Sequence, residues 1–248
     1  MRLTVLGACG AWPAAGQACS GFLVERDGFR LLVDVGYATV PRLLEHCPAN
    51  RVDAVFVSHG HPDHCADLNP LLRARSLGAA RPPRPLPVYS LAGALDRVLA
   101  LDRPGMLDDA YTLHEFGAGE QWEIGPFRAY TRLLPHWTPN AGVRLEAGGR
   151  ALAYTGDTGP SPEVVELARG ADALLAEASF ADEVPEDSRH DLTSAADAGR
   201  QAAQAGVGRL VLTHLFPDTD PDAARAAATG AYRGDIAVAA PGLVVDLP

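Results

Sequence analysis

The sequence contains no lysine, so all 21 of its positively charged side chains are arginines. This absence excludes pyridoxal and other Schiff-base chemistry, which needs a lysine amine. It also excludes a P-loop, whose lysine contacts phosphates. The 248 residues carry a net charge of −10. Such an acidic chain is unsuited to broad contact with a nucleic acid backbone, which requires an excess of positive charge.

Cysteine is scarce, and the four that occur, Cys9, Cys19, Cys47 and Cys65, include no CxxC pair. No run approaches the ~18 apolar residues of a membrane span, and no apolar signal segment follows Met1. We therefore expect a cytoplasmic protein with reduced thiols and no membrane contact. With 47% hydrophobic residues, the chain is long enough to form one domain over residues 1–248 whose core needs no disulfide or metal.

Short apolar runs bounded by Gly, Pro or Asp alternate with Ala-rich helical patterns. We expect helices over 40–46, 68–77 and 91–101, and a helix from 162 to 168 capped by Ser161. A further helix capped by Thr193 or Ser194 should end near 205, and Asp220 should open the last one. Strands are expected at 3–6, 21–25, 30–33, 54–57, 87–89, 127–134, 142–146, 151–154, 173–176, 210–212, 236–239 and 243–245. This pattern indicates an α/β fold of sheets covered by helices on their outer faces.

The most informative segment is an apolar strand that leads into three histidines and a carboxylate, namely His59, His61, Asp63 and His64. His59 and His61 lie two positions apart on an extended chain, so they can converge on one metal ion. Asp63 and His64 follow the turn at Pro62 and can face a second ion. Imidazole and carboxylate donors suit zinc, with manganese or iron as alternatives.

Two metal ions need more ligands than these four, and three later apolar runs each lead into a suitable side chain: His136, Asp157 and His214. This is the pattern expected where the edge of a sheet builds an active site. Taken singly, each is an ordinary residue at the end of a strand. Together with the first cluster, they indicate a metal centre. We interpret His46 and His114, which lie outside this pattern, as surface residues.

The HxHxDH motif, followed by a lone His, a Thr-Gly-Asp and a final Thr-His, resembles the metallo-β-lactamase-fold superfamily of dinuclear hydrolases. The resemblance extends from Gly7 to His214. It implies a four-layer αβ/βα sandwich with two metal ions at one edge, between two sheets. It also implies a division of the ligands, with His59, His61 and His136 on one metal, Asp63, His64 and His214 on the other, and Asp157 bridging both.

Within this superfamily, the chain resembles the ribonuclease Z and phosphodiesterase branch. The similar segments are Asp34 to Gly36, Thr155 to Thr158, Ala176 to Phe180 and Arg209 to His214. Three other groups of the superfamily fit less well. Flavodiiron proteins carry Glu at the position of His61, and glyoxalase II-like enzymes and β-CASP nucleases have additional domains for which this chain has no room. Two features depart from ribonuclease Z. The long basic arm that clamps tRNA has no counterpart, and Leu192 stands where that family places a leaving-group histidine, so tRNA is not expected as a substrate.

The resemblance implies a phosphodiesterase that acts on a small or medium phosphodiester, with a hydroxide bridging the two metal ions as nucleophile. Asp63 would bind a metal and orient the attacking water, and His190 or Asp191 would protonate the leaving group, assisted by Glu177. A helix-capping role is the alternative for Asp191. Asp34 would fix the tautomer of one ligand histidine, with a plain strand-end turn as the alternative.

The same metal core can hydrolyse esters or lactones, and a non-hydrolytic accessory protein can retain the fold. An arginine-lined pocket would favour a phosphodiester substrate, and an apolar pocket an ester or lactone. Arg73, Arg75, Arg81 and Arg84 form the one concentration of positive charge, which could meet a phosphate, although a solvated loop is the simpler interpretation. The sequence is compatible with a homodimer as well as a monomer.

Overall fold

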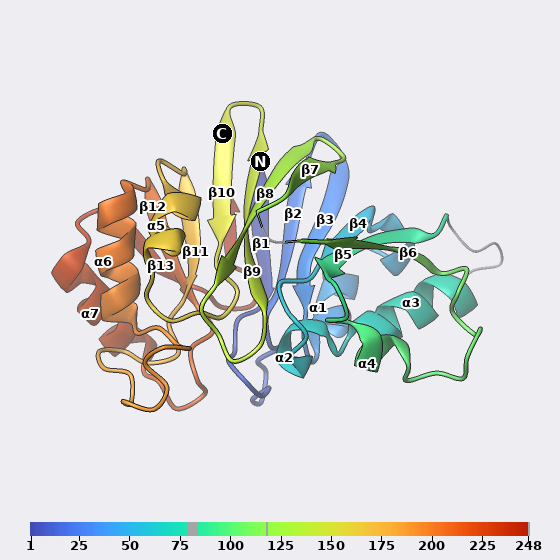
Figure 1. Ribbon diagram of the computed structural model, residues 1–248, viewed down its shortest axis with the longest axis horizontal. Coiled ribbons are helices and arrows are strands. Elements are labelled where there is room, and N and C mark those ends of the chain that lie inside the picture. The colour runs from blue at the N-terminus through green and yellow to red at the C-terminus, as the bar shows by residue number, and fades with distance from the viewer. Residues whose placement is uncertain (79–83, 118, 248) are drawn as a thin grey trace.

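The computed structural model describes residues 1–78, 84–117 and 119–247, and its strands form two seven-stranded sheets (Figure 1). The first sheet has the order β14-β1-β2-β3-β4-β5-β6 and the second β13-β12-β11-β10-β9-β8-β7. The strands of the first sheet are β1 (Arg2–Gly7), β2 (Gly21–Arg26), β3 (Phe29–Val35), β4 (Ala54–Phe56), β5 (Leu86–Leu91), β6 (Tyr111–Phe116) and β14 (Val244–Asp246). Those of the second are β7 (Gln121–Ile124), β8 (Phe127–Leu134), β9 (Asn140–Ala147), β10 (Arg150–Tyr154), β11 (Ala173–Glu177), β12 (Arg209–Thr213) and β13 (Asp235–Val238).

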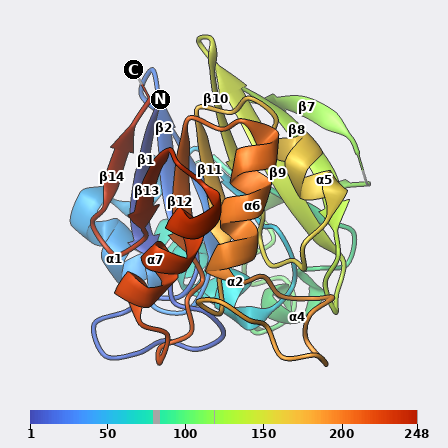
Figure 2. The same cartoon turned by 90° about the vertical axis from the view of Figure 1, so that its left-hand side faces the viewer.

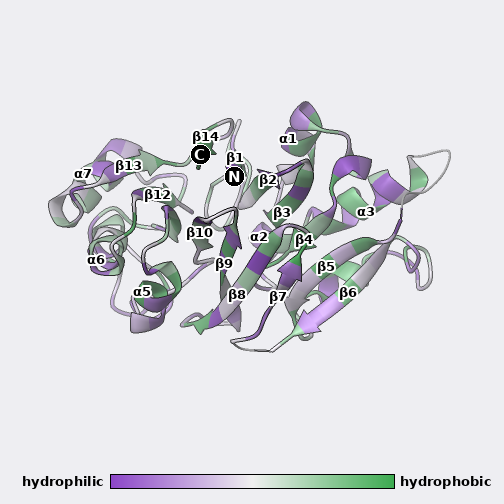
Figure 3. Ribbon diagram, turned by 90° about the horizontal axis from the view of Figure 1, so that it is seen from above, coloured by the Kyte–Doolittle hydropathy of each residue, from purple (hydrophilic) through white to green (hydrophobic). Residues whose placement is uncertain are grey.

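Helices cover the outer face of each sheet, and the inner faces pack against each other (Figures 1 and 3). The helices of the first half are α1 (Thr39–His46), α2 (Pro62–Cys65), α3 (Leu68–Leu77) and α4 (Asp96–Leu99), with a 3₁₀ turn at Ala49–Arg51. Those of the second half are α5 (Pro162–Ala168), α6 (Ala195–Ala205) and α7 (Pro221–Ala231), which lie in front of the second sheet in Figure 2. The expected four-layer αβ/βα sandwich is thus confirmed.

Each sheet contains a block of parallel strands, β3 to β6 in the first and β10 to β13 in the second. The carboxyl ends within such a block meet at one edge of its sheet. Phe22 and Tyr154, whose rings lie 5.2 Å apart, belong to the apolar core between the sheets. This packing sets the two halves face to face, so side chains from both can meet at the edge of the sandwich.

Several predicted elements differ from the structure. The helix expected over 91–101 is wrong, because Leu91 ends the parallel strand β5, Gly93 turns the chain at φ +71°, and only α4 is helical. Strands β6 and β7 and the one-turn helix α2 were not predicted. Ser161 precedes α5 but makes no capping hydrogen bond, whereas Ser194 accepts one from the Asp197 N–H and Asp220 one from the Asp222 N–H.

The cysteines and the helix lengths bear on the general character of the chain. All four cysteines are buried, and none of them forms a disulfide. In the ranges the structure describes, no helix combines the length and apolar character needed to cross a membrane.

Candidate metal centre

The loop after β4 presents the HxHxDH segment at the edge of the first sheet. His59 and His61 lie on an extended chain, and Pro62 then begins α2, which turns Asp63 and His64 back toward them. The close approach of α2 to β3 requires glycine at position 36. A Cβ added to Gly36 would lie only 1.8 Å from the carbonyl oxygen of Asp63. The local chain path therefore brings all four polar side chains to one side of the loop.

The second sheet supplies three further side chains from the loops after its strands. His136 follows β8, Asp157 follows β10, and His214 follows β12 with a φ of +60°, which is uncommon for a residue other than glycine. The amide of Asn140 donates hydrogen bonds to the carbonyl oxygens of Thr155 and Asp157, at 3.0 and 2.6 Å. This buried amide fixes the Asp157 loop beside the start of β9.

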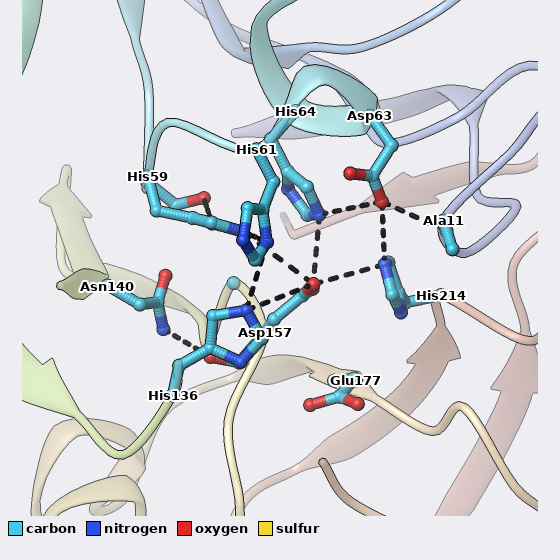
Figure 4. Close-up of polar contacts among 12 residues, drawn as sticks. Ala11, His59, His61, Asp63, His64, His136, Asn140, Asp157, Glu177 and His214 are labelled. Carbon is cyan, nitrogen blue, oxygen red and sulfur yellow. Dashed lines mark hydrogen bonds and ion pairs between the residues drawn. The ribbon is translucent and has the colours of Figure 1, made fainter. Parts of the chain in front are cut away.

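The seven side chains converge into two groups that share Asp157 (Figure 4). In each group the candidate ligand atoms all lie within 4.8 Å of one another. One group is His59, His61, His136 and Asp157, and the other is Asp63, His64, Asp157 and His214. This grouping matches the division of ligands that the family resemblance implies, with the carboxylate of Asp157 between the two halves.

The distances place Asp157 at the middle of the cluster. Its Oδ1 lies 3.1 Å from His64 Nε2, and its Oδ2 lies 3.2 Å from His214 Nε2 and 3.7 Å from His59 Nε2. His61 Nδ1 lies 3.1 Å from Nε2 of both His59 and His136. The seven side chains come from four separate stretches of the chain, the β4–α2 segment and the loops after β8, β10 and β12, yet their donor atoms converge on a common centre.

Four of the histidines bind a second group through Nδ1, which leaves Nε2 free to act as an acceptor. The acceptors of the Nδ1–H groups are Ser58 Oγ for His59 (3.0 Å), Asp34 Oδ2 for His64 (2.7 Å), the Asp191 carbonyl for His136 (2.8 Å) and Ser179 Oγ for His214 (3.0 Å). Carboxylate and carbonyl oxygens can only accept hydrogen bonds, so the histidines that contact them must donate from Nδ1. The two serine hydroxyls also act as acceptors for the histidines, because each donates its own proton elsewhere, Ser58 to Asp34 and Ser179 to Glu177. The Nε2 lone pairs therefore face the centre, as in histidines that bind a metal ion.

Two buried atoms of the cluster, His64 Nε2 and Asp157 Oδ1, form an ion-pair contact with each other at 3.1 Å, but neither has a hydrogen-bond partner in the part of the chain that the structure describes. Buried polar atoms normally have a partner, because an unpaired one costs about 1–3 kcal/mol. Divalent cations would satisfy both atoms, and the nitrogen and carboxylate donors are those that zinc, manganese and iron accept. The residues present thus fit a pair of metal ions.

The electrostatics of the cluster favour cations. Burial opposes ionisation of Asp63 and Asp157, but the charges of His64 and His214 outweigh it and lower the pKa of both carboxyls below their usual range. Burial lowers the pKa of His59, and its histidine neighbours lower it further. Burial opposes protonation of His64 and His214, but the charge of Asp157 and the other nearby carboxylates outweighs it and raises the pKa of both histidines. The two ionised carboxylates thus attract positive charge, which divalent cations would supply in place of the two protons.

Asp34, expected to fix a ligand histidine, is completely buried and accepts four hydrogen bonds. Besides His64, its donors are the Ser58 N–H (2.7 Å), the Ser58 hydroxyl (2.8 Å) and the Tyr154 hydroxyl (2.6 Å). Asp34 lies inside β3, one residue before its end, and its φ of +55° is an uncommon, strained conformation for a strand residue other than glycine. Tyr154, which comes from the opposite sheet, was not identified from the sequence, although it directly precedes the Thr-Gly-Asp motif.

Glu177 lies beneath the cluster rather than beside His190. Its Oε2 accepts from the Thr158 N–H at 2.5 Å, and its Oε1 accepts from the Ser179 hydroxyl at 2.8 Å and the Thr193 N–H at 3.2 Å. Burial and the nearby charge of Asp157 raise the pKa of Glu177 to about 8. The carboxyl thus links the neighbour of Asp157 to the serine that binds His214.

The His190 side chain is exposed, and in the described ranges it makes no hydrogen bond or ion pair with any of the seven converging residues. Its backbone is nevertheless close to the site. The carbonyl of the next residue, Asp191, binds His136, and a Cβ on Gly159 would lie 2.0 Å from the His190 carbonyl oxygen. The carbonyl of Asp191, not its carboxylate, is the group that contacts the cluster.

The surroundings of the centre are aromatic rather than basic. Among the described residues, no arginine bonds to the seven side chains. Arg73 pairs with Asp102, and Arg75 is buried and donates to backbone carbonyls, so the solvated-loop interpretation is wrong for Arg75. Arg81 lies outside the described residues. Two exposed tryptophans lie next to candidate ligands, a feature that no sequence motif marked. The Trp137 ring lies 5.1 Å from that of His136, and Trp12 follows Ala11, whose N–H bonds to Asp63.

His46 and His114 are exposed, as expected. The ring of His114 stacks on Tyr89 with centroids 4.8 Å apart. Neither histidine belongs to the two ligand groups.

Residues 29–215 match the family model described as the beta-lactamase superfamily domain. The chain is 32% identical to the probable metallo-hydrolase YhfI of Bacillus subtilis over 98% of this chain and 99% of the relative. A crystal structure of YhfI superposes with a TM-score of 0.90 at 30% identity and covers 98% of both chains. A ribonuclease Z of Myxococcus xanthus is 30% identical over 100% of this chain and 98% of its own.

Proposed function

Because this chain belongs to the metallo-β-lactamase-fold superfamily, in the branch that includes ribonuclease Z, we propose that it is a hydrolase that uses two divalent metal ions to cleave phosphodiester bonds. The observation that carries the proposal is the pair of ligand groups that share Asp157. Zinc is the metal that the donor set favours, with manganese or iron as alternatives. The name of the Myxococcus relative supports phosphodiester chemistry.

Two such ions, when bound, would lower the pKa of a water molecule and offset negative charge on phosphoryl oxygens. The residues of the chain supply the rest. Asp63 Oδ2 accepts a hydrogen bond from the Ala11 N–H at 2.9 Å and lies 3.1 Å from His214 Nε2, the atom that would bind a metal ion. Its Oδ1 makes no hydrogen bond within the described residues, so it is available to orient water and accept its proton.

We propose His190 as the group that protonates the leaving alkoxide, because its loop borders the first ligand group and its imidazole is open to solvent. In this scheme Glu177 is a positioning residue, which acts by holding neighbouring groups and does not contact the substrate. Its hydrogen bonds to Ser179 and to the Thr158 N–H keep His214 and the Asp157 loop in place. A small phosphodiester is the proposed substrate, and tRNA is not, since the chain is acidic.

The test is turnover of bis-p-nitrophenyl phosphate by purified protein loaded with Zn²⁺, Mn²⁺ or Fe²⁺, together with the metal content. His136→Ala should lose metal and turnover, whereas the matched change His46→Ala, at an exposed histidine outside the cluster, should keep both. Absence of turnover with all three metals would contradict the proposal.

Hydrolysis of an ester or lactone is the second candidate, and the aromatic surroundings free of described arginine contacts favour it. Assaying p-nitrophenyl acetate and a panel of lactones beside the phosphodiester separates the two, because the preferred substrate has the higher kcat/KM. Failure of all of them would favour an accessory protein without turnover. The single domain, the cytoplasmic location and a homodimer also stay predictions.

A further inference from the structure

The geometry points to a binding subsite for a planar aromatic group beside the metal centre, with the Trp12 indole as its contact surface. This inference rests on the proposed function and deepens it, because it names the chemistry of the substrate's organic part. That part is a flat π system, such as a nucleobase or an aryl ring, attached to the phosphoryl group. A flat group of either origin would use the same face of the indole.

The loop that carries Trp12 is bonded directly to the candidate metal ligands. The Ala11 N–H donates to Asp63 Oδ2 at 2.9 Å (Figure 4), and the Gly10 N–H donates to the Leu215 carbonyl at 2.9 Å. The Trp12 N–H bonds back to the Gly10 carbonyl at 2.7 Å and closes a tight turn around Ala11, whose φ is +60°. These bonds set the position of the indole relative to the centre.

Gly10 makes this arrangement possible. A Cβ at position 10 would lie 2.6 Å from the His214 carbonyl oxygen and 2.9 Å from His214 Nδ1. The Trp12 loop therefore packs directly on the His214 loop, with no room for a larger residue between them.

The indole is ordered by aromatic packing yet remains 49% exposed. Its ring stacks on Phe216 with centroids 5.7 Å apart at 27°, and Phe216 in turn packs edge-on against Phe180 at 5.1 Å. The Phe216 ring lies 6.3 Å from the ring of His214. A series of neighbouring aromatic rings thus leads from the candidate ligand His214, through Phe216, to the exposed indole of Trp12. We call these three rings the aromatic stack.

The charge distribution defines what each part of the site binds. Two divalent cations would outweigh the carboxylates of Asp63 and Asp157, so the centre attracts an anionic phosphoryl group. No described arginine bonds to the cluster, so aromatic side chains are the groups beside it that can recognise the uncharged part of the substrate. Trp137 is also exposed and lies against His136, but only Trp12 is held by a second aromatic ring, that of Phe216, among the described residues. Stacking on an aromatic side chain is tolerant of sequence and ring type, and strengthens binding about tenfold.

The experiment measures binding to the zinc-loaded protein by isothermal titration calorimetry, with two matched pairs of probes. Phenylphosphonate is compared with methylphosphonate, and adenosine 5′-monophosphate with ribose 5-phosphate. We expect at least one aromatic probe to bind about tenfold more tightly than its non-aromatic match. Trp12→Ala should abolish that difference in affinity, while the Kd of the non-aromatic probe should stay within about twofold of its wild-type value. Trp12→Phe should retain most of the difference, because phenylalanine keeps an aromatic face. The pair that responds identifies an aryl ring or a nucleobase.

Leu44→Ala, at an exposed apolar residue of α1, is the matched control and should change no affinity. Three results would overturn the subsite. They are equal affinity for the two probes within both pairs, an equal loss of affinity for both probes of a pair in Trp12→Ala, and no binding of any probe. Aromatic preference without turnover of any phosphodiester would instead contradict the proposed function alone. Turnover of bis-p-nitrophenyl phosphate without aromatic preference would contradict the subsite alone.

Discussion

At the scale of single residues, the buried carboxylate of Asp34 determines the orientation of His64. It accepts hydrogen bonds from Ser58, His64 and Tyr154 and is completely buried. Because a carboxylate only accepts, it keeps the proton of His64 on Nδ1 and directs the Nε2 lone pair toward the centre. A buried aspartate with four donors is also costly to replace, since each donor would lose its partner.

Asp34→Asn should weaken metal binding by about 10–100-fold, because the amide presents donors to groups that need an acceptor. Tyr154→Phe is the matched control. It removes one donor but keeps the carboxylate, so its effect should be smaller than that of Asp34→Asn. Competition against a chromophoric chelator gives both affinities, and a larger loss in Tyr154→Phe would argue against this role of Asp34.

At the scale of secondary structure elements, α1 begins without a capping side chain of its own. Its N-cap residue is Ala38, in the left-handed region at φ 62°, and the Val40 N–H instead donates to Asp67 Oδ2 at 2.8 Å. Asp67 immediately precedes α3 and also donates its N–H to the Val35 carbonyl. One side chain from a neighbouring element therefore satisfies the start of α1.

Asp67→Ala should lower the free energy of unfolding by about 1 kcal/mol, the usual cost of losing a helix cap. Urea denaturation at neutral pH measures this change in the free energy of unfolding. Asp109→Ala, at an exposed acidic residue, should change stability by less than about 0.5 kcal/mol. Equal effects of the two changes would show that Asp67 does not cap α1.

Strands β10 and β11 are aligned by Asp172, whose Oδ2 accepts from the Ala151 N–H and whose Oδ1 accepts from Arg150. Burial opposes ionisation, but these two partners outweigh it and lower the pKa of Asp172. Since the folded-state pKa is lowered, ionised Asp172 stabilises the fold above the ordinary carboxyl pKa, and this contribution is lost as the pH falls through the folded-state pKa.

Asp172→Asn should therefore lower the melting temperature at neutral pH, and the difference from wild type should narrow as the pH falls from about 5 to about 3. Thermal unfolding followed by circular dichroism over this range tests the sign. A difference that grows toward acidic pH would contradict the assignment.

At the scale of the whole molecule, the centre joins the two halves of the sandwich. Four of its residues come from the β4–α2 region of the first half, and His136, Asp157 and His214 come from the second. Ions bound there would cross-link the two sheets at their common edge. Since an unfolded chain cannot present this arrangement, metal binding is expected to stabilise the fold.

Saturation with Zn²⁺ at about 100 times its Kd should stabilise the protein by about 2.7 kcal/mol per site, and a chelator should remove the gain. Differential scanning calorimetry measures the shift in melting temperature. His214→Ala should reduce the zinc-dependent shift, whereas His46→Ala should retain it. An unchanged melting temperature after complete zinc loading would contradict cross-linking by the centre.

The sequence by itself determined which side chains form the candidate metal centre. Spacing and family resemblance together predicted the four-layer fold and the seven residues that converge. These features depend on short-range patterns: an HxHxDH segment keeps its chemistry wherever the loop lies, and alternating or helical periodicity marks most elements. Polar edge strands such as β6 (Tyr111–Phe116) carry too weak a pattern, which is why they were not predicted.

Only the tertiary structure decided how Tyr154 meets Asp34, why Glu177 supports the centre from beneath, and where the Trp12 indole lies. The Tyr154–Asp34 and Trp12–Phe216 contacts join residues far apart in the chain, and Glu177 also bonds to Thr158, 19 positions away. Their positions depend on the packing of two sheets and on close approaches such as Gly36 to Asp63. No local propensity encodes such distances, because they arise from the sum of many contacts across the whole core.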